Sequence, residues 1–435
     1  MNKSVEIVLF LVSTLCYALL AYFVPRSNFT LTVSYLSVNF LAYVFYYIKA
    51  EEINVKHIVL VAILFRLITV FALPALSDDY FRFVWDGLLT YNEFNPYEYT
   101  PTQAIEQGVL PNRELYELLN SKDYFSVYPA INQFIYFLGV SVSPTSYYGA
   151  TVVMKMIMLG AEIGTILLLI NLLQSFRLPT KSIVLYALNP LVIMEFCGNL
   201  HFEGFMIFFM LLAFWLTMRQ RLVVGAIAFA TAICIKIIPV LFLPLFLKKL
   251  GFQKTVVFSV LTLVACLFFF LPFYNETTFP HILESIRLYI GGNFEFNSSF
   301  HRLMQLGEWE KHEIIKFLPK VVLVSSYLWI WWKIDTKHWH SYAYSFMLTY
   351  SIYLFFSQSV HPWYILPAVA FSMLTSFRFS MLWSYMACFT YITYLDEGNY
   401  SQNPWVILIE YIVVFALFGY EFWRYLINSK RIDLG

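Results

Sequence analysis

The sequence predicts an all-α, polytopic integral membrane protein, and two observations carry this prediction. Hydrophobic residues make up 60% of the 435-residue chain, whereas charged residues make up only 13%. Soluble domains are nearer half apolar and a quarter charged. In addition, apolar stretches of membrane-spanning length recur along the whole chain. The net charge of +1 gives no indication of a nucleic-acid partner, and we expect the lipid bilayer to surround the protein.

The apolar stretches predict about 13 to 14 transmembrane helices in one domain covering residues 1–435. They lie near residues 5–25, 32–48, 57–75, 148–175, 182–197, 202–218, 222–247, 254–273, 317–333, 342–357, 362–377, 379–395 and 404–427. We expect the first stretch to be a retained helix and not a cleaved signal peptide. The stretch 222–247 contains Lys236, Pro239 and Pro244, which predicts two half-helices with a break between them.

Basic residues in the short loops predict the orientation of these helices. Loops containing pairs such as Arg177/Lys181, Arg219/Arg221 and Lys248/Lys249 are expected in the cytoplasm, together with both termini. This assignment requires that residues 128–140 do not cross the cell membrane. The large loop 76–147 is then extracytoplasmic. Four further polar stretches are expected on the same face: residues 195–204, the surroundings of Lys236, residues 291–302 and residues 357–364. Their convergence predicts an active site at the extracytoplasmic membrane boundary.

The loop 76–147 opens with the sequence "SDDYFRFVWDG". Asp78 and Asp79 are adjacent carboxylates at a lipid boundary, where one of them can take a proton from a hydroxyl nucleophile. The alternative is that they only cap the helix that follows. This helix has apolar residues at helical spacing, and it is expected to lie on the membrane with Trp85 at headgroup depth. Arg82 and Asp86 are four residues apart and can pair, in a substrate-facing or a purely structural role.

Ionisable residues in the other polar stretches are further candidates for substrate binding. Glu195, His201 and Glu203 surround one outer turn. A third ligand at metal spacing is missing there, so we expect them to orient a substrate hydroxyl and not to bind metal. Lys236 is a lone cation in an apolar stretch, where it can bind a phosphate or reach to the membrane surface.

Three residues of the last two polar stretches can neutralise a leaving phosphate or hold its lipid: His301, Arg302 and His361. The sequence contains neither a phosphate-binding G-x-x-x-x-G-K-[ST] loop nor a G-x-G-x-x-G dinucleotide motif. An activated donor is therefore expected to come from the membrane. No cofactor is predicted, although the paired aspartates leave a divalent metal open.

The run "SDDYFRFVWDGLLTYNEFNPYEYTP" resembles the first-loop signature of GT-C glycosyltransferases that use polyprenyl-phosphate sugars. It is most similar to the glycosyltransferase family 87 and bacterial alpha-1,6-mannosyltransferase group. The later pieces "VYPA", "NPLVIMEFCGNLHFEG", "IKIIPVLFLP", "NFEFNSS" and "HPWY" follow in the same order. The resemblance implies a GT-C-like fold, a catalytic base at Asp78 or Asp79, and site roles for Lys236 and His361. Its motifs also contain the substrate-binding candidates Asn95, Tyr97, Tyr128, Asn297 and Trp363.

These observations together predict a membrane glycosyltransferase. We expect it to move a sugar, for which the resemblance implies mannose, from a polyprenyl-phosphate donor to a glycan or glycolipid hydroxyl, with inversion. The alternative is a transporter or flippase of a lipid-linked glycan, which would show paired broken helices in two similar halves. The sequence shows only one clear break, at Lys236. Transfer of a non-sugar group such as phosphoethanolamine would need a metal cluster that is not apparent.

Overall fold

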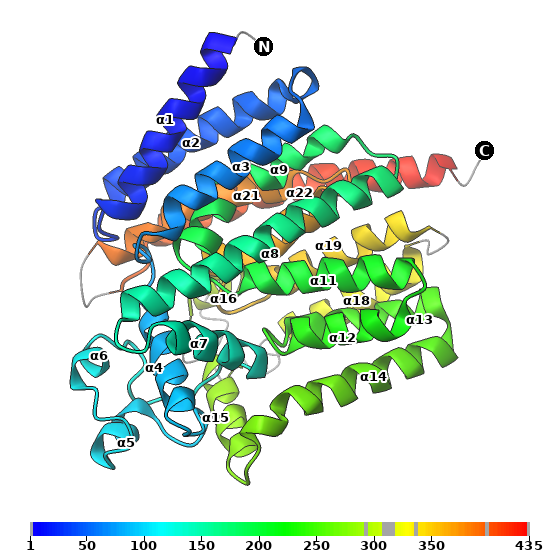
Figure 1. Cartoon of the computed structure of the whole chain (residues 1–435). Helices are drawn as coiled ribbons and strands as arrows, with labels where there is room; N and C mark the ends of the chain where they lie inside the picture. The colour runs from blue at the N-terminus through cyan, green and yellow to red at the C-terminus, as the bar shows by residue number, and fades with distance from the viewer. Residues whose placement is uncertain (1–2, 291–294, 307–317, 335–337, 396–399, 433–435) are drawn as a thin grey trace.

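A computed structural model describes residues 3–290, 295–306, 318–334, 338–395 and 400–432. These residues form an all-α structure, which confirms the predicted fold class (Figure 1). Within the described ranges the extended backbone is limited to one isolated bridge, between Phe296 and Ser359. One large hydrophobic core runs through the long helices, and a small second cluster lies around Tyr97 and Phe273.

Most helices of the bundle begin and end close to the predicted stretches. The first half contains α1 (Lys3–Tyr22), α2 (Phe29–Ile48), α3 (Val55–Val70), α8 (Tyr147–Ser175), α11 (Glu203–Met218) and α12 (Leu222–Ile233). The second half contains α14 (Phe252–Phe270), α18 (Leu318–Lys333), α19 (Trp339–Phe355), α20 (Leu366–Ser372), α21 (Phe379–Met386) and α22 (Pro404–Ile432). Helices α12, α20 and α21 cover only part of their predicted stretches. Capping side chains define some of these starts: Asn28 accepts a hydrogen bond from the N–H of Leu31, and Ser146 accepts one from Gly149.

Five helices of the described residues are long and apolar enough to cross a membrane. They are α1, α2, α8, α14 with its extension to Phe273, and α22 up to Ile427. A pair of short helices, Thr180–Ala187 and Pro190–Gly198, would make a sixth span with a bend of 54°. Fewer spans meet this criterion than the 13 to 14 expected from the sequence. Some apolar helices of the described residues have only 16 or 17 residues, namely α3, α11, α18 and α19, and other apolar stretches are divided into shorter helices. The chain is nevertheless a polytopic membrane protein.

Two of the divided stretches matter for the site. The predicted break near Lys236 is confirmed: α12 ends at Ile233, a 3₁₀ turn covers Ile238–Phe242, and α13 covers Leu245–Leu250. The bend at Asn189–Pro190 was not predicted, since the sequence shows an unbroken apolar stretch there apart from this dipeptide. Pro190 cannot donate a backbone hydrogen bond, and the Asn189 side chain caps the new helix by accepting from Leu191 and Val192.

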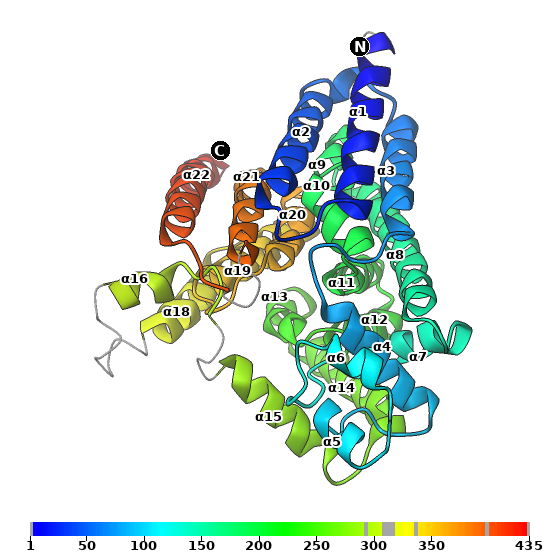
Figure 2. The ribbon, with the colours of Figure 1, turned by 90° about the vertical axis from the view of Figure 1, so that its left-hand side faces the viewer.

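The loop 76–147 folds into four helices at one end of the bundle, together with α15 (Thr278–Ile290). These are α4 (Asp79–Tyr91), α5 (Pro101–Glu106), α6 (Arg113–Glu117) and α7 (Ala130–Val142), and both views show them grouped beside α15 (Figures 1 and 2). The α8–α9, α11–α12 and α13–α14 connections, which carry the basic pairs named above, lie at the opposite end in Figure 1.

Helix α4 is held inside the protein and does not lie on a lipid surface. It packs against α7, and Gly87 permits this contact because a Cβ there would lie 2.7 Å from the backbone oxygen of Tyr136. Trp85, expected at headgroup depth, is fully buried, with its ring centroid 6.2 Å from that of Tyr116. The helix itself was predicted correctly, but its surroundings were not, because periodicity alone cannot distinguish lipid from protein on an apolar face.

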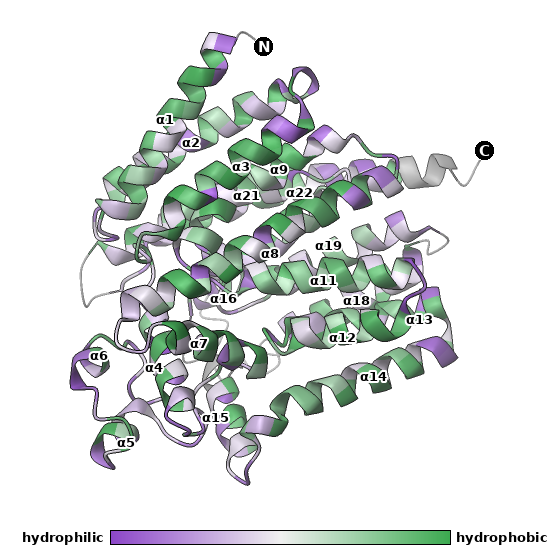
Figure 3. Cartoon of the chain, viewed as in Figure 1, coloured by the Kyte–Doolittle hydropathy of each residue, from purple (hydrophilic) through white to green (hydrophobic). Residues whose placement is uncertain are grey.

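Hydropathy follows the same arrangement (Figure 3). Hydrophobic residues fill the middle of the long helices, and hydrophilic residues gather in the loop helices and at the opposite end of the bundle. Helix α14 has a row of exposed apolar side chains that includes Leu263, Leu267 and Phe268. Such a surface would be unfavourable in water and suits the acyl chains of a bilayer.

Candidate active site

The two adjacent aspartates of the loop begin α4, and each has a different partner. Asp78 is the N-cap residue, and its Oδ2 lies 2.5 Å from Nη2 of Arg26 in the α1–α2 connection. The Arg26 guanidinium also lies 5.2 Å from the centre of the Tyr394 ring. Asp79 accepts a hydrogen bond of 3.1 Å from the side-chain amide of Asn120. Both carboxylates are partly exposed, as a site for a substrate hydroxyl requires.

Glu195 and His201 form a buried pair in the next polar stretch. Glu195 lies in a π-helical turn, Ile193–Gly198, of the kind frequently found at functional sites. Its Oε2 is 2.7 Å from Nδ1 of His201, and its Oε1 accepts hydrogen bonds from Asn199 and Tyr391. Leu200, between these residues, has a φ of 62°, which a branched side chain rarely adopts. Such strain is found where the surrounding structure holds a functional turn in place.

This turn is connected directly to the aspartates. The side-chain oxygen of Asn199 accepts a 3.1 Å hydrogen bond from the N–H of Leu76, two residues before Asp78. Because Asn199 also donates to Glu195, one side chain links the Glu195–His201 pair to the start of the loop. The position of Asp78 relative to this pair is therefore determined by hydrogen bonds as well as by packing.

Lys236 lies just beyond the end of α12 and forms an ion pair with Glu203 at the start of α11. Its ammonium group is 4.1 Å from the centre of the Tyr364 ring, a cation–π contact. Lys236 is the one charged residue of its apolar stretch, and the helix break brings it against the N-terminus of α11, where Glu203 is buried. Lys236 is about 29% exposed, so an incoming anion can reach it.

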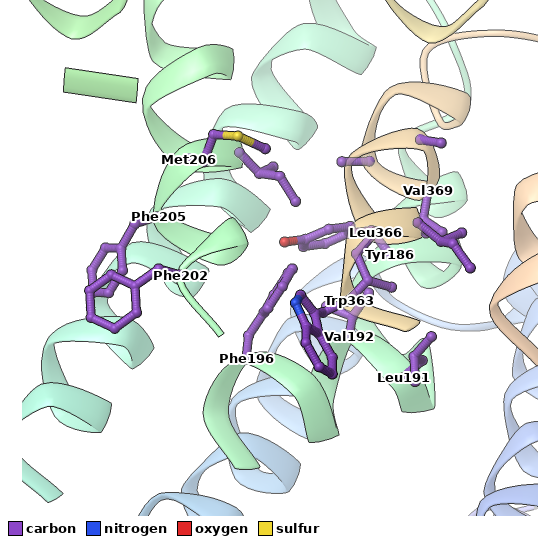
Figure 4. Close-up of a cluster of buried hydrophobic side chains, with 14 of the residues drawn as sticks. Tyr186, Leu191, Val192, Phe196, Phe202, Phe205, Met206, Trp363, Leu366 and Val369 are labelled. Atoms are coloured by element: carbon purple, nitrogen blue, oxygen red, sulfur yellow. The ribbon is translucent and has the colours of Figure 1, made fainter. Parts of the chain in front are cut away.

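A row of stacked rings joins residues 295–302 and 357–364, which belong to two of the predicted polar stretches. The ring centroids of His201 and Trp363 are 3.6 Å apart, those of Trp363 and His361 are 4.5 Å apart, and those of His361 and Phe296 are 4.3 Å apart. Figure 4 shows Trp363, the middle ring of this row, beside Phe196 in a cluster of buried hydrophobic side chains. The stack joins His201 of the Glu195 turn to His361 through the Trp363 ring.

His361 is neutral in this environment. Burial first, and the nearby Lys236 and His201 second, lower its pKa to about 3. A positive charge on His361 is disfavoured here, because the imidazole would carry it beside the ammonium group of Lys236. Its part in neutralising a leaving phosphate or holding the lipid stays a prediction. A neutral imidazole can still donate or accept a hydrogen bond.

Arg82 and Asp86 anchor the loop and do not line an open site. Arg82 donates to Asp86 over 2.7 Å and to the backbone oxygens of Ser121 and Tyr124 over 2.9 Å each. Asp86 also accepts from Ser126 and is completely buried, as is Trp85. Of the two roles that the sequence left open for Arg82 and Asp86, these contacts favour the structural one.

Three other candidates also hold the loop in place. Asn95 donates to the backbone oxygen of Phe273 over 2.7 Å, which connects the loop to the end of α14. Tyr97 is buried, and its hydroxyl donates to the backbone oxygen of Tyr128. Tyr128 packs edge-on against Phe83 of α4. These contacts of Asn95, Tyr97 and Tyr128 stabilise the loop helices.

The remaining candidates lie in residues 295–306. Asn297 has a φ of 48°, donates to the buried Glu410 of α22 over 3.0 Å and accepts from Tyr411 through its backbone oxygen. Arg302 donates to Gln305 within α16 (Phe300–Leu306), and His301 is partly exposed on the same short helix. Asn297 thus positions Phe296 beneath His361, whereas His301 and Arg302 belong to a neighbouring surface.

The candidate site therefore consists of Asp78 and Asp79, the Glu195–His201 pair and the Glu203–Lys236 pair, which come from separate parts of the chain. Asp79 lies within electrostatic reach of both Tyr364 and Tyr394, which contact Lys236 and Arg26 respectively. Sequence reasoning missed Arg26, Asn120, Tyr391 and Tyr394, which have no motif and lie far from the aspartates in sequence. Among the described residues, no group of three or more His, Cys, Asp or Glu side chains is placed to hold a metal ion.

A sequence profile of the MptA_B family, described as alpha-(1->6)-mannopyranosyltransferase, N-terminal domain, matches residues 11–250. This is more than half of the chain, and it includes both aspartates, the Glu195–His201 turn and Lys236. No curated protein matches the chain. The family match agrees with the resemblance seen in the first loop, and it implies mannosyltransferase activity in a membrane protein. The chain belongs to the MptA_B family of alpha-(1->6)-mannopyranosyltransferases.

Proposed function

We propose that the protein transfers mannose from a polyprenyl-phosphate donor to a hydroxyl of a glycan or glycolipid acceptor, with inversion at the anomeric carbon. The reaction would take place on the extracytoplasmic face of the cell membrane. The observation that carries this proposal is the clustering of Asp78 and Asp79, the Glu195–His201 pair and the Glu203–Lys236 pair at the end of the bundle where the loop helices lie.

The chemistry follows from the charges in this cluster. One aspartate takes the proton of the acceptor hydroxyl while the hydroxyl oxygen attacks the anomeric carbon, and the bond from this carbon to the phosphate oxygen breaks. The departing polyprenyl phosphate gains negative charge. Lys236 supplies a positive charge that is partly exposed, and stabilisation of the developing charge by this group would lower the barrier.

The surroundings of the cluster favour a lipid donor over a nucleotide sugar. The long helices of the bundle have apolar outward surfaces, and the sequence carries no recognised nucleotide-phosphate loop. Basic loops at the opposite end support a cytoplasmic position for that end and an extracytoplasmic position for the site.

The alternative function is a transporter of lipid-linked glycans, and an experiment has to distinguish it from a glycosyltransferase. The bend at Asn189–Pro190 is a second helix break, so the number of breaks no longer argues against a transporter. Membership of a mannosyltransferase family does argue against it.

The test is a donor comparison with purified protein in vesicles or detergent. We expect radiolabelled mannose to pass from polyprenyl-phosphate mannose to an α-mannoside acceptor, and we expect no transfer from GDP-mannose. A control with Glu106→Gln, an exposed carboxylate of the loop, should retain full activity. Transfer from GDP-mannose alone, or movement of labelled lipid across vesicles without transfer, would contradict the proposal.

A further inference from the structure

We propose that Arg26 is a positioning residue that gives the two adjacent aspartates different roles: it holds Asp78 as an anchor and leaves Asp79 to take the proton of the acceptor hydroxyl. This inference rests on the proposed function. It also assigns a part in the site to the α1–α2 connection, which lies far from the loop in sequence.

Arg26 binds Asp78 from a constrained position. Its Nη2 lies 2.5 Å from Asp78 Oδ2, and the two side chains are only 25% and 34% exposed. The guanidinium also lies 5.2 Å from the ring centre of Tyr394, at the far end of the chain. An arginine held by both a carboxylate and an aromatic ring has little freedom to release either.

The ion pair makes Asp78 a poor candidate for proton uptake. A protonated Asp78 would lose its charge-assisted contact with Arg26 and leave a half-buried guanidinium without its partner. Asp78 is also the N-cap residue of α4, where a negative charge is favoured by the helix dipole. Both interactions keep Asp78 ionised and fix the start of α4.

Asp79 meets the opposite conditions. Its Oδ1 accepts a hydrogen bond from the side-chain amide of Asn120, an uncharged partner that orients the carboxylate. Lys236, whose ammonium group lies over the Tyr364 ring, can bind the donor phosphate, while Asp79 takes the proton of the acceptor hydroxyl.

The proposed step balances without a further reactant. The O–H bond of the acceptor breaks and its proton goes to Asp79, while the oxygen forms a bond to the anomeric carbon. The bond between that carbon and the phosphate oxygen breaks, and its electron pair leaves with the polyprenyl phosphate. Arg26 and Asp78 exchange no proton in this step.

The experiment compares kcat and KM for Asp78→Asn, Asp79→Asn, Arg26→Gln and the Arg26→Gln/Asp78→Asn double variant. We expect Asp79→Asn to lower kcat by about 10²- to 10⁴-fold, the range for a lost general base. Asp78→Asn and Arg26→Gln should each lower kcat less, by about tenfold, and the double variant should be no worse than either alone. Arg26→Lys should restore part of the loss. Exposed matched controls, Asp123→Asn and Arg113→Gln, should leave kcat unchanged.

A second measurement does not depend on activity. Arg26→Gln should lower the Tm of the wild type. This decrease should largely disappear in an Asp78→Asn background, because Asp78 is the aspartate that pairs with Arg26, and it should persist in an Asp79→Asn background. The inference is overturned if Asp78→Asn costs more kcat than Asp79→Asn, or if Arg26 couples to Asp79 in the Tm cycle. Failure of the wild-type protein to use any polyprenyl-phosphate mannose would instead overturn the proposed function, and the Tm cycle would still test the pairing.

Discussion

The candidate site shows that neighbouring residues of one chemical type can have different surroundings. Asp78 faces a guanidinium and Asp79 faces an amide, although no sequence pattern distinguishes them. The sequence identified Asp78, Asp79, Glu195, His201, Glu203 and Lys236 as candidates, and the structure brings these together. It could not identify their partners, because the ion pairs of Asp78 and Lys236 join residues that are distant in the chain.

Lys236 offers a direct test of phosphate recognition. We expect Lys236→Ala to lower the rate of mannose transfer by about 10²- to 10³-fold, as for removal of one group that stabilises developing charge. Lys236→Arg should retain more activity, since it keeps the positive charge. Lys254→Ala, an exposed lysine at the start of α14, serves as the control. Equal rates for Lys236→Ala and the control would remove Lys236 from the site.

His361 predicts a pH effect on stability. Burial first, and the nearby charges second, lower its pKa to about 3, whereas the unfolded chain has a histidine pKa of about 6.5. The native state therefore binds fewer protons than the unfolded state between these values, so stability is full above pH 6.5 and falls as the pH falls. From pH 6.5 to pH 5 this amounts to about 2 kcal/mol. The Tm of the wild type should thus drop more than that of His361→Gln over this interval, and identical drops would contradict the assignment.

At the scale of elements, the loop helices are held to the bundle by contacts that the sequence pattern could not specify. Apolar periodicity predicted α4, and polar composition predicted the loop. Neither shows that α4 is enclosed by α7 and the segment 120–126, since enclosure depends on tertiary contacts. The short helices α5, α6 and α16 were also missed, because their segments are too short to show a period, and the longer helix α15 was missed as well.

The contact between α4 and α7 depends on Gly87. A Cβ at this position would lie 2.7 Å from the backbone oxygen of Tyr136, which cannot move without displacing α7. We expect Gly87→Ala to destabilise the protein by roughly 1–3 kcal/mol, the usual cost of overpacking. Gly160→Ala, in α8 where a Cβ meets nothing within 4 Å, should be neutral or slightly stabilising. Thermal unfolding in detergent compares the two, and equal Tm values would contradict this packing.

Breaking the Arg82–Asp86 ion pair is expected to lower the free energy of unfolding more than Gly87→Ala does. Both side chains are buried, and each has further hydrogen bonds to the segment 121–126. Arg82→Gln leaves the Asp86 carboxylate buried without its ion partner, which costs about 3–5 kcal/mol in comparable pairs. We expect a lower Tm and faster proteolysis of the loop, with Arg113→Gln as the exposed control. A variant with unchanged Tm and only a raised KM would show that Arg82 contacts the substrate instead.

At the scale of the whole molecule, the fold class was predictable, whereas the number of spans was not. Hydrophobic composition requires helices in a membrane, because backbone groups must be satisfied within each segment. The Asn189–Pro190 bend and the short helices of the second half depend on local capping and packing. Membership of a mannosyltransferase family agrees with the first-loop motif, which was the most specific part of the sequence.

The most direct measurement is mannose transfer from radiolabelled polyprenyl-phosphate mannose by the purified protein and by its Asp78→Asn/Asp79→Asn double variant. The double variant keeps the size and polarity of both side chains and removes both carboxylates. We predict transfer by the wild type and a loss of at least about 100-fold in the double variant, with the donor still bound. Undiminished transfer by the double variant would show that the base lies elsewhere and that the cluster at the start of α4 is not the active site.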